Sequence, residues 1–318
     1  MIENVASLVV FVRVAETLSF TSAAAQLAIS GPAASKAIAR LERRMGVRLF
    51  HRTTRQVALT DDGQAFLERC RRILEDVQEA EELLTSRRLT LRGRLRVQMP
   101  LGFGRHVILP ALPELLNAYP ELAVDVDLSD RVVDFTNEGL DLAVRIGPIS
   151  DSRVIAKRLY NIRFVTCASP GYLERHGTPA KPEDLAGHEC LPYWMPPLGR
   201  HREWMFERRG VPFTLPLSGR LNINNSEALI DAAVAGQGIV SVATFLAAEA
   251  VKAGKLKVIL REFVTKGPSV SAVHLPTRHL STRIRAFLDF LAAVVPEEPA
   301  WDRAVLGAEP VRKQARTR

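Results

Sequence analysis

Cysteine is scarce in this sequence of 318 residues, which contains only Cys70, Cys167 and Cys190. Three scattered cysteines are too few for a disulfide framework or a zinc site, so we expect reduced thiols in a cytoplasm. The sequence also lacks an apolar run near the ~20 residues that a membrane span needs, and an N-terminal apolar segment with a small-residue cleavage site. These absences predict a cytoplasmic protein with no membrane partner.

Residue patterns expected of a catalytic or metal site are also missing. The seven histidines show neither H-x-x-x-H nor H-E-x-x-H spacing, and there is no glycine-rich phosphate loop. An enzyme would need a nucleophile with its base, or clustered metal ligands. We therefore expect no enzyme activity, no cofactor and no metal ion.

Lys and Arg, by contrast, are abundant and unevenly distributed. The formal net charge is +8, and residues 1–60 hold eight Lys or Arg against three Asp or Glu. Residues 61–92 hold six against eight, so the balance changes sign there. A positive excess confined to the N-terminal region and a short C-terminal tail suggests a local site for a polyanion.

The first sixty residues show the periodicity of three helices. Apolar spacing predicts a first helix over residues 5–18 and a short alanine-rich helix over residues 19–28. A third helix follows a tight turn, with Ser30 as its N-cap and Pro32 in its first turn, where the missing N–H is harmless. Its buried stripe is predicted at Ala34, Ile38 and Leu41. Its opposite face is polar and basic and carries Pro32, Ser35, Lys36, Arg40 and Arg43.

A basic helix that follows a short turn is typical of a helix-turn-helix, whose second helix enters the DNA major groove by its N-terminal residues. The alternative is a basic face that is merely solvated. Beyond this helix, two short strands are predicted at Leu49–Arg52 and Gln56–Leu59, with residues 53–55 at their turn. Such a wing would place basic side chains beside the groove for phosphate contacts.

The segment SFTSAAAQLAISGPAASKAIARLERRMGVRLFHRTTRQVALTDDG resembles the winged helix-turn-helix signature of LysR-type transcriptional regulators almost residue for residue. The shared motifs are the serine-proline helix start, the LE pair at Leu41 and Glu42, the G-x-x-LF-x-R run from Gly46 to Arg52 and the LT-x-x-G step from Leu59 to Gly63. The resemblance implies that Pro32, Ser35 and Lys36 reach DNA, with Arg52 and Arg55 in the wing. The predicted DNA-binding residues are Ser30, Pro32, Ser35, Lys36, Arg40, Arg52, Thr53 and Arg55.

One position departs from the family pattern. The family often has glutamine between the serine and the proline, a side chain able to read a base edge, whereas this chain has Gly31. Because Gly31 has no side chain, we expect base discrimination to rest on Ser35, Lys36, Arg40 or the shape of the DNA. The hypothesis predicts an altered or relaxed sequence preference.

A long helix is predicted from Thr60, its N-cap, to about Arg88. Apolar residues recur along it at spacings of four and three, which is typical of a pairing seam between two copies of a chain. A helix buried against its own domain would show the same stripe. The resemblance implies that residues 61–90 form a dimerisation linker. The seam residues are Phe66, Cys70, Ile73, Val77, Ala80 and Leu84.

From residue 93 the pattern changes to that of an α/β protein. The predicted strands lie at residues 93–99, 123–129, 141–147, 164–169, 217–224 and 270–275. The predicted helices include residues 106–120, a short one at 133–138, one after Asn225 and one at 279–294. Alternation of strand and helix at this spacing favours a parallel sheet in a doubly wound subdomain.

The expected architecture is an N-terminal all-α winged helix-turn-helix, a long linker helix and a two-lobed α/β domain that resembles periplasmic binding proteins. Residues 1–60 would form the DNA-binding domain and residues 93–296 the effector-binding domain. Within the latter, lobe I would comprise residues 93–163 and 268–296, and lobe II residues 164–267. The tail at residues 297–318 shows no apolar periodicity and is predicted to be disordered.

The ligand site of such a clamp follows from sheet topology, because ligands lie outside the carboxyl ends of the strands, often against a helix N-terminus. The predicted effector-binding residues are Pro100, Leu101, Gly102, Phe103, Asp130, Arg145, Gly147, Asn225 and Ser226. Each also has a structural alternative: Gly102 and Gly147 as turn residues, and Arg145 as an ion-pair partner of Asp141 or Asp130. The charges favour a neutral or acidic effector without choosing between them.

The sequence as a whole predicts a transcriptional regulator gated by a small-molecule effector. Its predicted partners are operator DNA with an inverted repeat, the effector, further copies of the chain in a homodimer or homotetramer, and RNA polymerase. The alternative is an enzyme or a small-ligand-binding protein on the same clamp. A second hypothesis is an oxidation-sensing pair, Cys167 and Cys190, although their apolar neighbours favour inert thiols.

Overall fold

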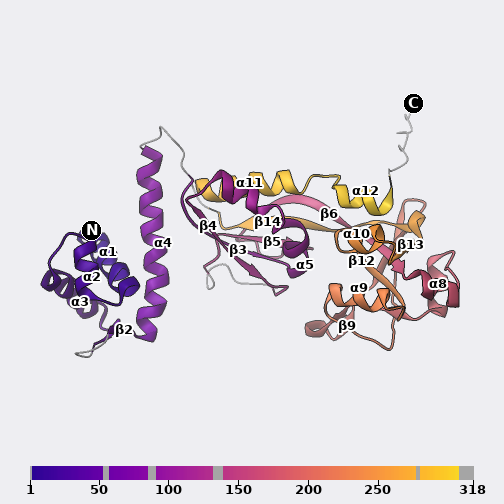
Figure 1. Ribbon diagram of the computed structural model, residues 1–318, viewed down its shortest axis with the longest axis horizontal. Coiled ribbons are helices and arrows are strands. Elements are labelled where there is room, and N and C mark those ends of the chain that lie inside the picture. Colours follow the sequence, from indigo (N-terminus) through magenta and orange to yellow (C-terminus); the bar gives the residue numbers. More distant parts are fainter. Residues whose placement is uncertain (1, 53–56, 85–90, 132–138, 277–279, 308–318) are drawn as a thin grey trace. The chain divides into compact units, whose positions relative to one another are not determined.

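The computed structural model describes residues 2–52, 57–84, 91–131, 139–276 and 280–307. The chain divides into two compact units, residues 1–89 and residues 90–318, and Figure 1 shows the elements of each. The N-terminal unit consists of α1 (Ile2–Thr17), α2 (Phe20–Gln26), α3 (Gly31–Met45), β1 (Phe50–Arg52), β2 (Val57–Leu59) and α4 (Asp61–Leu84).

The elements of the N-terminal unit agree with the sequence pattern. The three predicted helices are present, and β1 pairs with β2 in an antiparallel hairpin. Ser19 caps α2, because its side chain accepts a hydrogen bond from the N–H of Ser22. The ring of Phe11 lies 5.4 Å from that of Phe50, so α1 packs directly on the hairpin. The predicted end of α4, near Arg88, lies outside the described residues.

The C-terminal unit is built on one mixed sheet. Its strands are β3 (Gly93–Met99), β4 (Leu122–Leu128), β5 (Leu142–Ile146), β6 (Ile155–Ala168), β7 (Cys190–Leu191), β12 (Ile239–Ala243), β13 (Lys257–Ile259) and β14 (Lys266–His274). Their order is β4-β3-β5-β14-β6-β12-β7, with β13 paired to β6. We call the part around β3, β4 and β5 lobe I, and the part around β7, β12 and β13 lobe II.

Two long antiparallel strands connect the lobes. β14 pairs with β5 in lobe I and with β6, and β6 continues to pair with β12 and β13 in lobe II. Figure 1 shows β6 and β14 running lengthwise from one lobe into the other. The predicted parallel sheet is therefore correct for β3, β4 and β5, whereas the strands that cross between lobes are antiparallel.

Helices cover both lobes. In lobe I, α5 (Leu101–Phe103) continues into a π-helical turn (Gly104–Ile108), followed by α6 (Leu112–Ala118) and, from the end of the chain, α11 (Thr282–Val294). In lobe II they are α8 (Pro170–His176), α9 (Ser226–Val234) and α10 (Thr244–Lys252). Two small hairpins, β8 (Trp194–Met195) with β9 (Arg200–His201) and β10 (Trp204–Arg208) with β11 (Val211–Leu215), complete lobe II.

The structure corrects several predicted elements. The strand expected at residues 164–169 is the end of the longer strand β6, which begins at Ile155. The helix expected at residues 106–120 starts earlier, at Leu101, and is interrupted around Pro110, which has no N–H for an intrahelical bond. No strand forms at residues 217–224, where the only pairing is an isolated bridge between Ile223 and Tyr193. Leu217 and Ile223 pack against the core of lobe II from a loop instead. The helix expected at residues 133–138 lies outside the described part of the chain.

The prediction of a disordered tail is wrong for residues 300–306, which form α12 (Ala300–Leu306). This helix is too short to show a periodicity that is recognisable in the sequence. It is held by tertiary contacts, because Asp302 and Val305 are buried and Trp301 packs against the lobe I core. Residues 308–318 lie outside the described residues.

Candidate functional site

Helix α3 begins and ends at residues that suit its termini. The Ser30 hydroxyl accepts a hydrogen bond from the N–H of Ala33 (3.3 Å), and Pro32 lies in the first turn. At the other end, Gly46 adopts a left-handed conformation with φ of 71° and donates its N–H to the carbonyl of Glu42. These caps fix the length of the helix that carries the predicted DNA contacts.

The two faces of α3 are as the sequence predicts. Ala34, Ile38 and Leu41 are buried, while Lys36 and Arg40 are exposed. Ser35 is half-buried, and Pro32 is exposed at the N-terminal end. A row of small and basic residues therefore lies on the surface of α3, where it can approach an acidic surface closely.

The wing is fastened to α3 through Glu42. Its carboxylate accepts hydrogen bonds from the backbone N–H groups of Leu49 (2.9 Å) and Phe50 (3.2 Å). The Thr60 hydroxyl donates to the carbonyl of Arg48 (2.7 Å) and accepts from the N–H of Gly63. Glu42 of the LE pair therefore positions the hairpin. The sequence marks this residue only through the family resemblance. The predicted contacts Thr53 and Arg55 lie outside the described residues, and so does the side chain of Arg52.

Gly63 has a steric explanation. A Cβ atom at this position would lie 2.0 Å from the carbonyl oxygen of Leu49, so only glycine lets α4 approach the start of the wing this closely. The LT-x-x-G step therefore locks the wing to the first turn of α4.

Helix α4 buries its first apolar residues in its own unit. Cys70 is fully buried in the N-terminal core, and the ring of Phe66 lies 5.1 Å from that of Phe11. Ile73, one turn further, is 43% exposed, and Val77 is half-buried. The seam predicted for dimerisation therefore splits: Phe66 and Cys70 pack within a single chain, whereas Ile73 is exposed on it. The side chain of Leu84 is outside the described set.

A cavity of about 380 Å³ lies between the lobes of the C-terminal unit. Every predicted effector-binding residue lines it except Gly147, which ends β5 with φ of +103° and makes a turn there. The lobe I wall comes from the turn after β3 and from Asp130 and Arg145. The lobe II wall includes Asn225 and Ser226 at the start of α9, where the Asn225 side chain caps the helix.

Sequence reasoning missed the basic and aromatic part of this cavity. Arg202 lines it with its guanidinium 4.4 Å from the ring centre of Phe164 and 5.1 Å from that of Tyr193. Its Nη2 donates to the carbonyl of Ser241 (2.9 Å), and burial lowers its pKa to about 10, so it stays charged at neutral pH. No sequence signal marked Arg202, because two of its partners, Phe164 and Ser241, lie on strands distant in the sequence.

Arg145 lines the cavity from lobe I and is held there by hydrogen bonds. Its Nη1 donates to the Oε1 of Gln98, which is itself fully buried and donates to the carbonyls of Ser129 (2.7 Å) and Arg131 (3.2 Å). Asp130 accepts a hydrogen bond from the N–H of Leu101 (3.2 Å) at the start of α5. This network fixes the ends of β3, β4 and β5 relative to one another.

A polar contact joins the two lobes beside the cavity. Glu227 of α9, which lines it, pairs with Arg105 (3.0 Å) and His106 (2.5 Å) of the π-helical turn in lobe I. The Arg105 side chain is 63% exposed and that of Glu227 is 22% exposed, so water reaches this contact. Glu227 therefore joins the lobes at the cavity itself.

Comparison with known proteins decides the family. Residues 5–64 match the model of the bacterial regulatory helix-turn-helix protein, LysR family, and residues 89–296 match that of the LysR substrate binding domain. The chain belongs to the LysR family of transcriptional regulators. As a LysR-type regulator it combines a DNA-binding helix-turn-helix with a domain that binds a small-molecule effector, and it forms oligomers.

Individual LysR relatives support this assignment over nearly the whole chain. The chain is 34% identical to the uncharacterized HTH-type transcriptional regulator YhjC of Escherichia coli K12, covering 93% of this chain and 99% of that protein. It is also 34% identical to the HTH-type transcriptional regulator CrgA of Neisseria meningitidis serogroup C, covering 91% and 96%. The solved structure of CrgA from Neisseria meningitidis matches with a TM-score of 0.59 and 32% identity, covering 92% and 98%.

Membership of the LysR family sets aside the alternative of an enzyme on the same clamp, since these proteins are DNA-binding regulators. No helix in the described part of the chain is both long and apolar enough to cross a membrane.

The oxidation-sensing hypothesis fails on geometry. Cys167 on β6 and Cys190 on β7 are separated by β12, which pairs with both strands. Two strand spacings amount to roughly 10 Å, beyond the ~7 Å limit between Cα atoms for a disulfide. Burial also raises the pKa of each thiol to about 12, which leaves little reactive thiolate. Both cysteines are packed core residues.

Proposed function

We propose that this LysR-type regulator binds an operator with two half-sites arranged as an interrupted inverted repeat. The observation that carries the proposal is the exposed face of α3, where Lys36 and Arg40 lie beside a helix start made of Ser30, Gly31 and Pro32. This small helix start lets the backbone come near the base edges, and the basic residues neutralise phosphates on either side.

Two such helices are required to read two half-sites, so the functional unit is a homodimer or a pair of homodimers. We propose that α4 supplies the contact through the face that begins at Ile73, whose side chain is exposed in the single chain. Recognition helices held by paired α4 helices reach half-sites about 34–36 Å apart, one turn of DNA.

The effector occupies the cavity between the lobes in this proposal. Arg202 stacked on Phe164 and Tyr193 offers positive charge next to flat apolar surfaces, and Arg145 approaches from lobe I. These groups favour a small acidic or strongly hydrogen-bonding molecule with an apolar part. Binding would change the contact of Glu227 with Arg105 and His106, and the shift of the lobes would alter the spacing of the DNA-binding units.

A DNA-binding regulator acts where the DNA is, so we place the protein in the cytoplasm. RNA polymerase is the expected downstream partner, because the spacing or bend of promoter DNA matters only through the enzyme that initiates there.

The DNA contacts are tested by comparing Lys36→Ala with Ser35→Ala. Lys36→Ala is expected to weaken binding to all sequences and to lower the slope of affinity against salt concentration by about 0.9, the value for one phosphate contact. Ser35→Ala is expected to change which sequences are preferred and to leave the salt slope intact. Glu68, exposed on α4, offers a control: Glu68→Ala changes neither property.

The two variants should be measured on the same randomised duplex library at several salt concentrations. Equal effects of Lys36→Ala and Ser35→Ala on every sequence would contradict the assignment. Gly31→Gln adds a side chain where no heavy atom lies within 4 Å of a Cβ, and we expect it to sharpen or shift the preferred site. An unchanged site preference and specific affinity would remove the role given to Gly31.

A further inference from the structure

Helix α12 lies beyond the part of the chain that matches the family. The effector-domain match ends at residue 296, and α12 spans Ala300–Leu306. Figure 1 shows α12, in yellow, beside α10 of lobe II, and the two helices pack against each other. The contacts of this helix therefore lie outside the matched domain.

The centre of α12 is a buried carboxylate with donors on two other elements. Asp302 is 6% exposed, and both its carboxylate oxygens accept from the hydroxyl of Tyr160 at 2.7 Å. The hydroxyl of Thr244 donates to the same group at 2.5 Å, and the Nε of Arg163 lies 3.5 Å from it. A buried carboxylate is stable only with such partners, so these contacts hold α12 in one position.

The donors belong to both lobes. Tyr160 lies on the crossing strand β6, in a core formed mainly by lobe I residues, and Thr244 is the first residue of α10 in lobe II. Ala243 and Phe245, next to Thr244, also reach this core. Other residues of α12 divide in the same way. Trp301 packs edge-to-face on Tyr160 with ring centres 6.1 Å apart, whereas Val305 is fully buried in the lobe II core.

The same donors are next to the wall of the effector cavity. Ala243 and Phe245, on either side of Thr244, line that cavity, and so does Ile162 of β6. Phe245 also meets Phe103 of lobe I edge-to-face, with ring centres 5.4 Å apart. A displacement of this wall by a ligand would therefore move the groups that hold Asp302.

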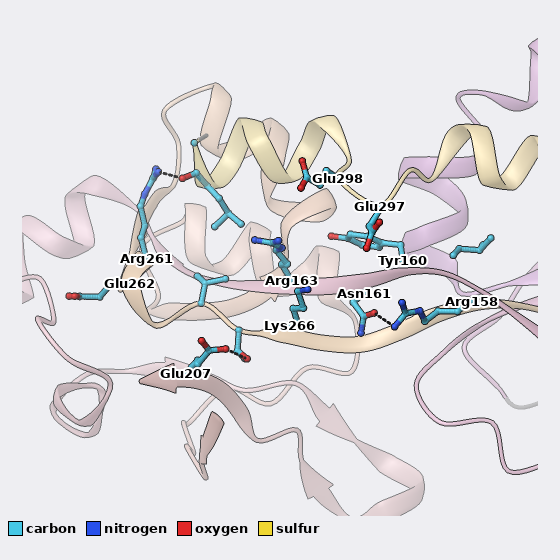
Figure 2. A pocket seen from close by; sticks show the side chains of 15 residues that line it. Arg158, Tyr160, Asn161, Arg163, Glu207, Arg261, Glu262, Lys266, Glu297 and Glu298 are labelled. Carbon is cyan, nitrogen blue, oxygen red and sulfur yellow. Dashed lines mark hydrogen bonds between the residues drawn. The ribbon is translucent and has the colours of Figure 1, made fainter. Parts of the chain in front are cut away.

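A second cavity, of about 960 Å³, lies beside α12. Figure 2 shows it with Arg163 and Lys266 on the crossing strands, and with Arg261, which donates to the carbonyl of Leu306 at 3.1 Å, at one side. Its walls are polar and charged, with Glu207, Glu297 and Glu298 among them.

We infer that α12 is a clasp between the lobes, in which Asp302 bonded to Tyr160 and Thr244 sets their relative position and so controls how the effector cavity responds to its ligand. The inference rests on the proposal that this cavity is the effector site. The clasp itself can be tested without an effector, so the two claims fail separately.

The test is amide hydrogen exchange of the full chain, free of effector, for the wild type, Asp302→Asn and the control Arg303→Ala, which alters an exposed residue on the same helix. Asp302→Asn is expected to raise exchange at least about 10-fold in the cavity wall of both lobes, at residues 101–103 in lobe I and 244–246 in lobe II. This corresponds to an opening equilibrium shifted by one factor of ten. Arg303→Ala is expected to match the wild type.

Exchange that rises only within α12 would overturn the inference, because the helix would then be a local cap without influence on the lobes. Equal exchange in Asp302→Asn and the wild type would overturn it too. If Asp302→Asn unfolds the whole unit, the same exchange measurement on Tyr160→Phe and on Thr244→Val tests the inference instead. Each removes one hydroxyl from one side, and the clasp predicts faster exchange in the cavity wall of the opposite lobe as well. An effect confined to the altered lobe would contradict it.

Discussion

Two sets of polar contacts join lobe I to lobe II, and they differ in burial. At the cavity, Glu227 pairs with Arg105 and His106, whose side chains are 63% and 34% exposed. At α12, Asp302 and Arg163 have side chains only 9% and 19% exposed, and two hydroxyl groups complete the site. Exposed pairs are weak and easily exchanged for water or a ligand, whereas buried ones are costly to break. The first set suits a contact that a ligand replaces, and the second suits a contact that holds the framework.

The largest effect is expected from removing the buried carboxylate. Asp302→Ala leaves the hydroxyls of Tyr160 and Thr244 without their acceptor and should lower the free energy of unfolding of the C-terminal unit by about 3 kcal/mol. Denaturant unfolding measures this. Arg303→Ala, on the same helix but exposed, should change it by less than about 0.5 kcal/mol. A loss for Asp302→Ala as small as that of the control would erase the contrast between the two sets.

A smaller loss, about 1 kcal/mol, is expected for Tyr160→Phe, which removes one donor to Asp302. Burial, and then the nearby Asp302 carboxylate, raise the pKa of the Tyr160 hydroxyl above its ordinary value of 10.0. Below pH 10.0 the Tyr160 hydroxyl is protonated in both the folded and the unfolded protein, so its contribution to stability is fully present. Above pH 10.0 the unfolded protein loses this proton more readily than the folded protein, so the free energy of unfolding falls as the pH rises. Unfolding measured between pH 8 and 11 should therefore show a steeper decline for the wild type than for Tyr160→Phe. Parallel curves would contradict this reading of Tyr160.

The exposed set predicts a still smaller effect. Glu227→Gln removes the charge that pairs with Arg105 and His106 and should cost less than about 1 kcal/mol, with the difference shrinking as salt is added. Chemical unfolding at low and at high ionic strength measures it. A loss as large as that of Asp302→Ala, or one insensitive to salt, would show that the contact at the cavity is part of the rigid framework.

The smallest effect is expected at the three cysteine thiols, which belong to neither set of contacts between the lobes. Burial raises the pKa of Cys70, Cys167 and Cys190 to about 12, so little thiolate exists near neutral pH. Native protein at pH 8 should react with iodoacetamide far more slowly than unfolded protein, and peroxide should leave DNA affinity unchanged. Fast labelling of Cys190 in the native state would reopen the oxidation-sensing hypothesis.

The N-terminal unit was largely predictable because its decisive contacts are short in sequence. The Ser30 hydroxyl accepts from the N–H of Ala33, only three residues further along the chain. The Glu42 carboxylate accepts from the N–H groups of Leu49 and Phe50, only seven and eight residues away. Local periodicity and capping patterns record such contacts directly. The split of the α4 seam was not predictable, because a stripe looks the same whether its partner is the chain's own α1 or a second copy.

The effector cavity was predictable only in part. The turns after β3, β4 and β5 follow from sheet topology, which is why Phe103, Asp130 and Arg145 could be placed. Arg202 depends on Phe164 and Ser241, and α12 depends on Tyr160, which is 142 residues distant from Asp302. No pattern within one segment records such pairs, so the buried arginine and the ordered helix in the tail emerged only from the structure.

The central claim is that the protein is a DNA-binding regulator with operator specificity. The most direct test is to select genomic fragments of the source organism with the purified protein at near-physiological salt and to sequence the fragments that it retains. The account predicts enrichment of one or a few intergenic segments that contain an interrupted inverted repeat, and lower total retention of the same segments by Lys36→Ala. Retention without any sequence preference, both alone and with candidate acidic effectors added, would contradict it.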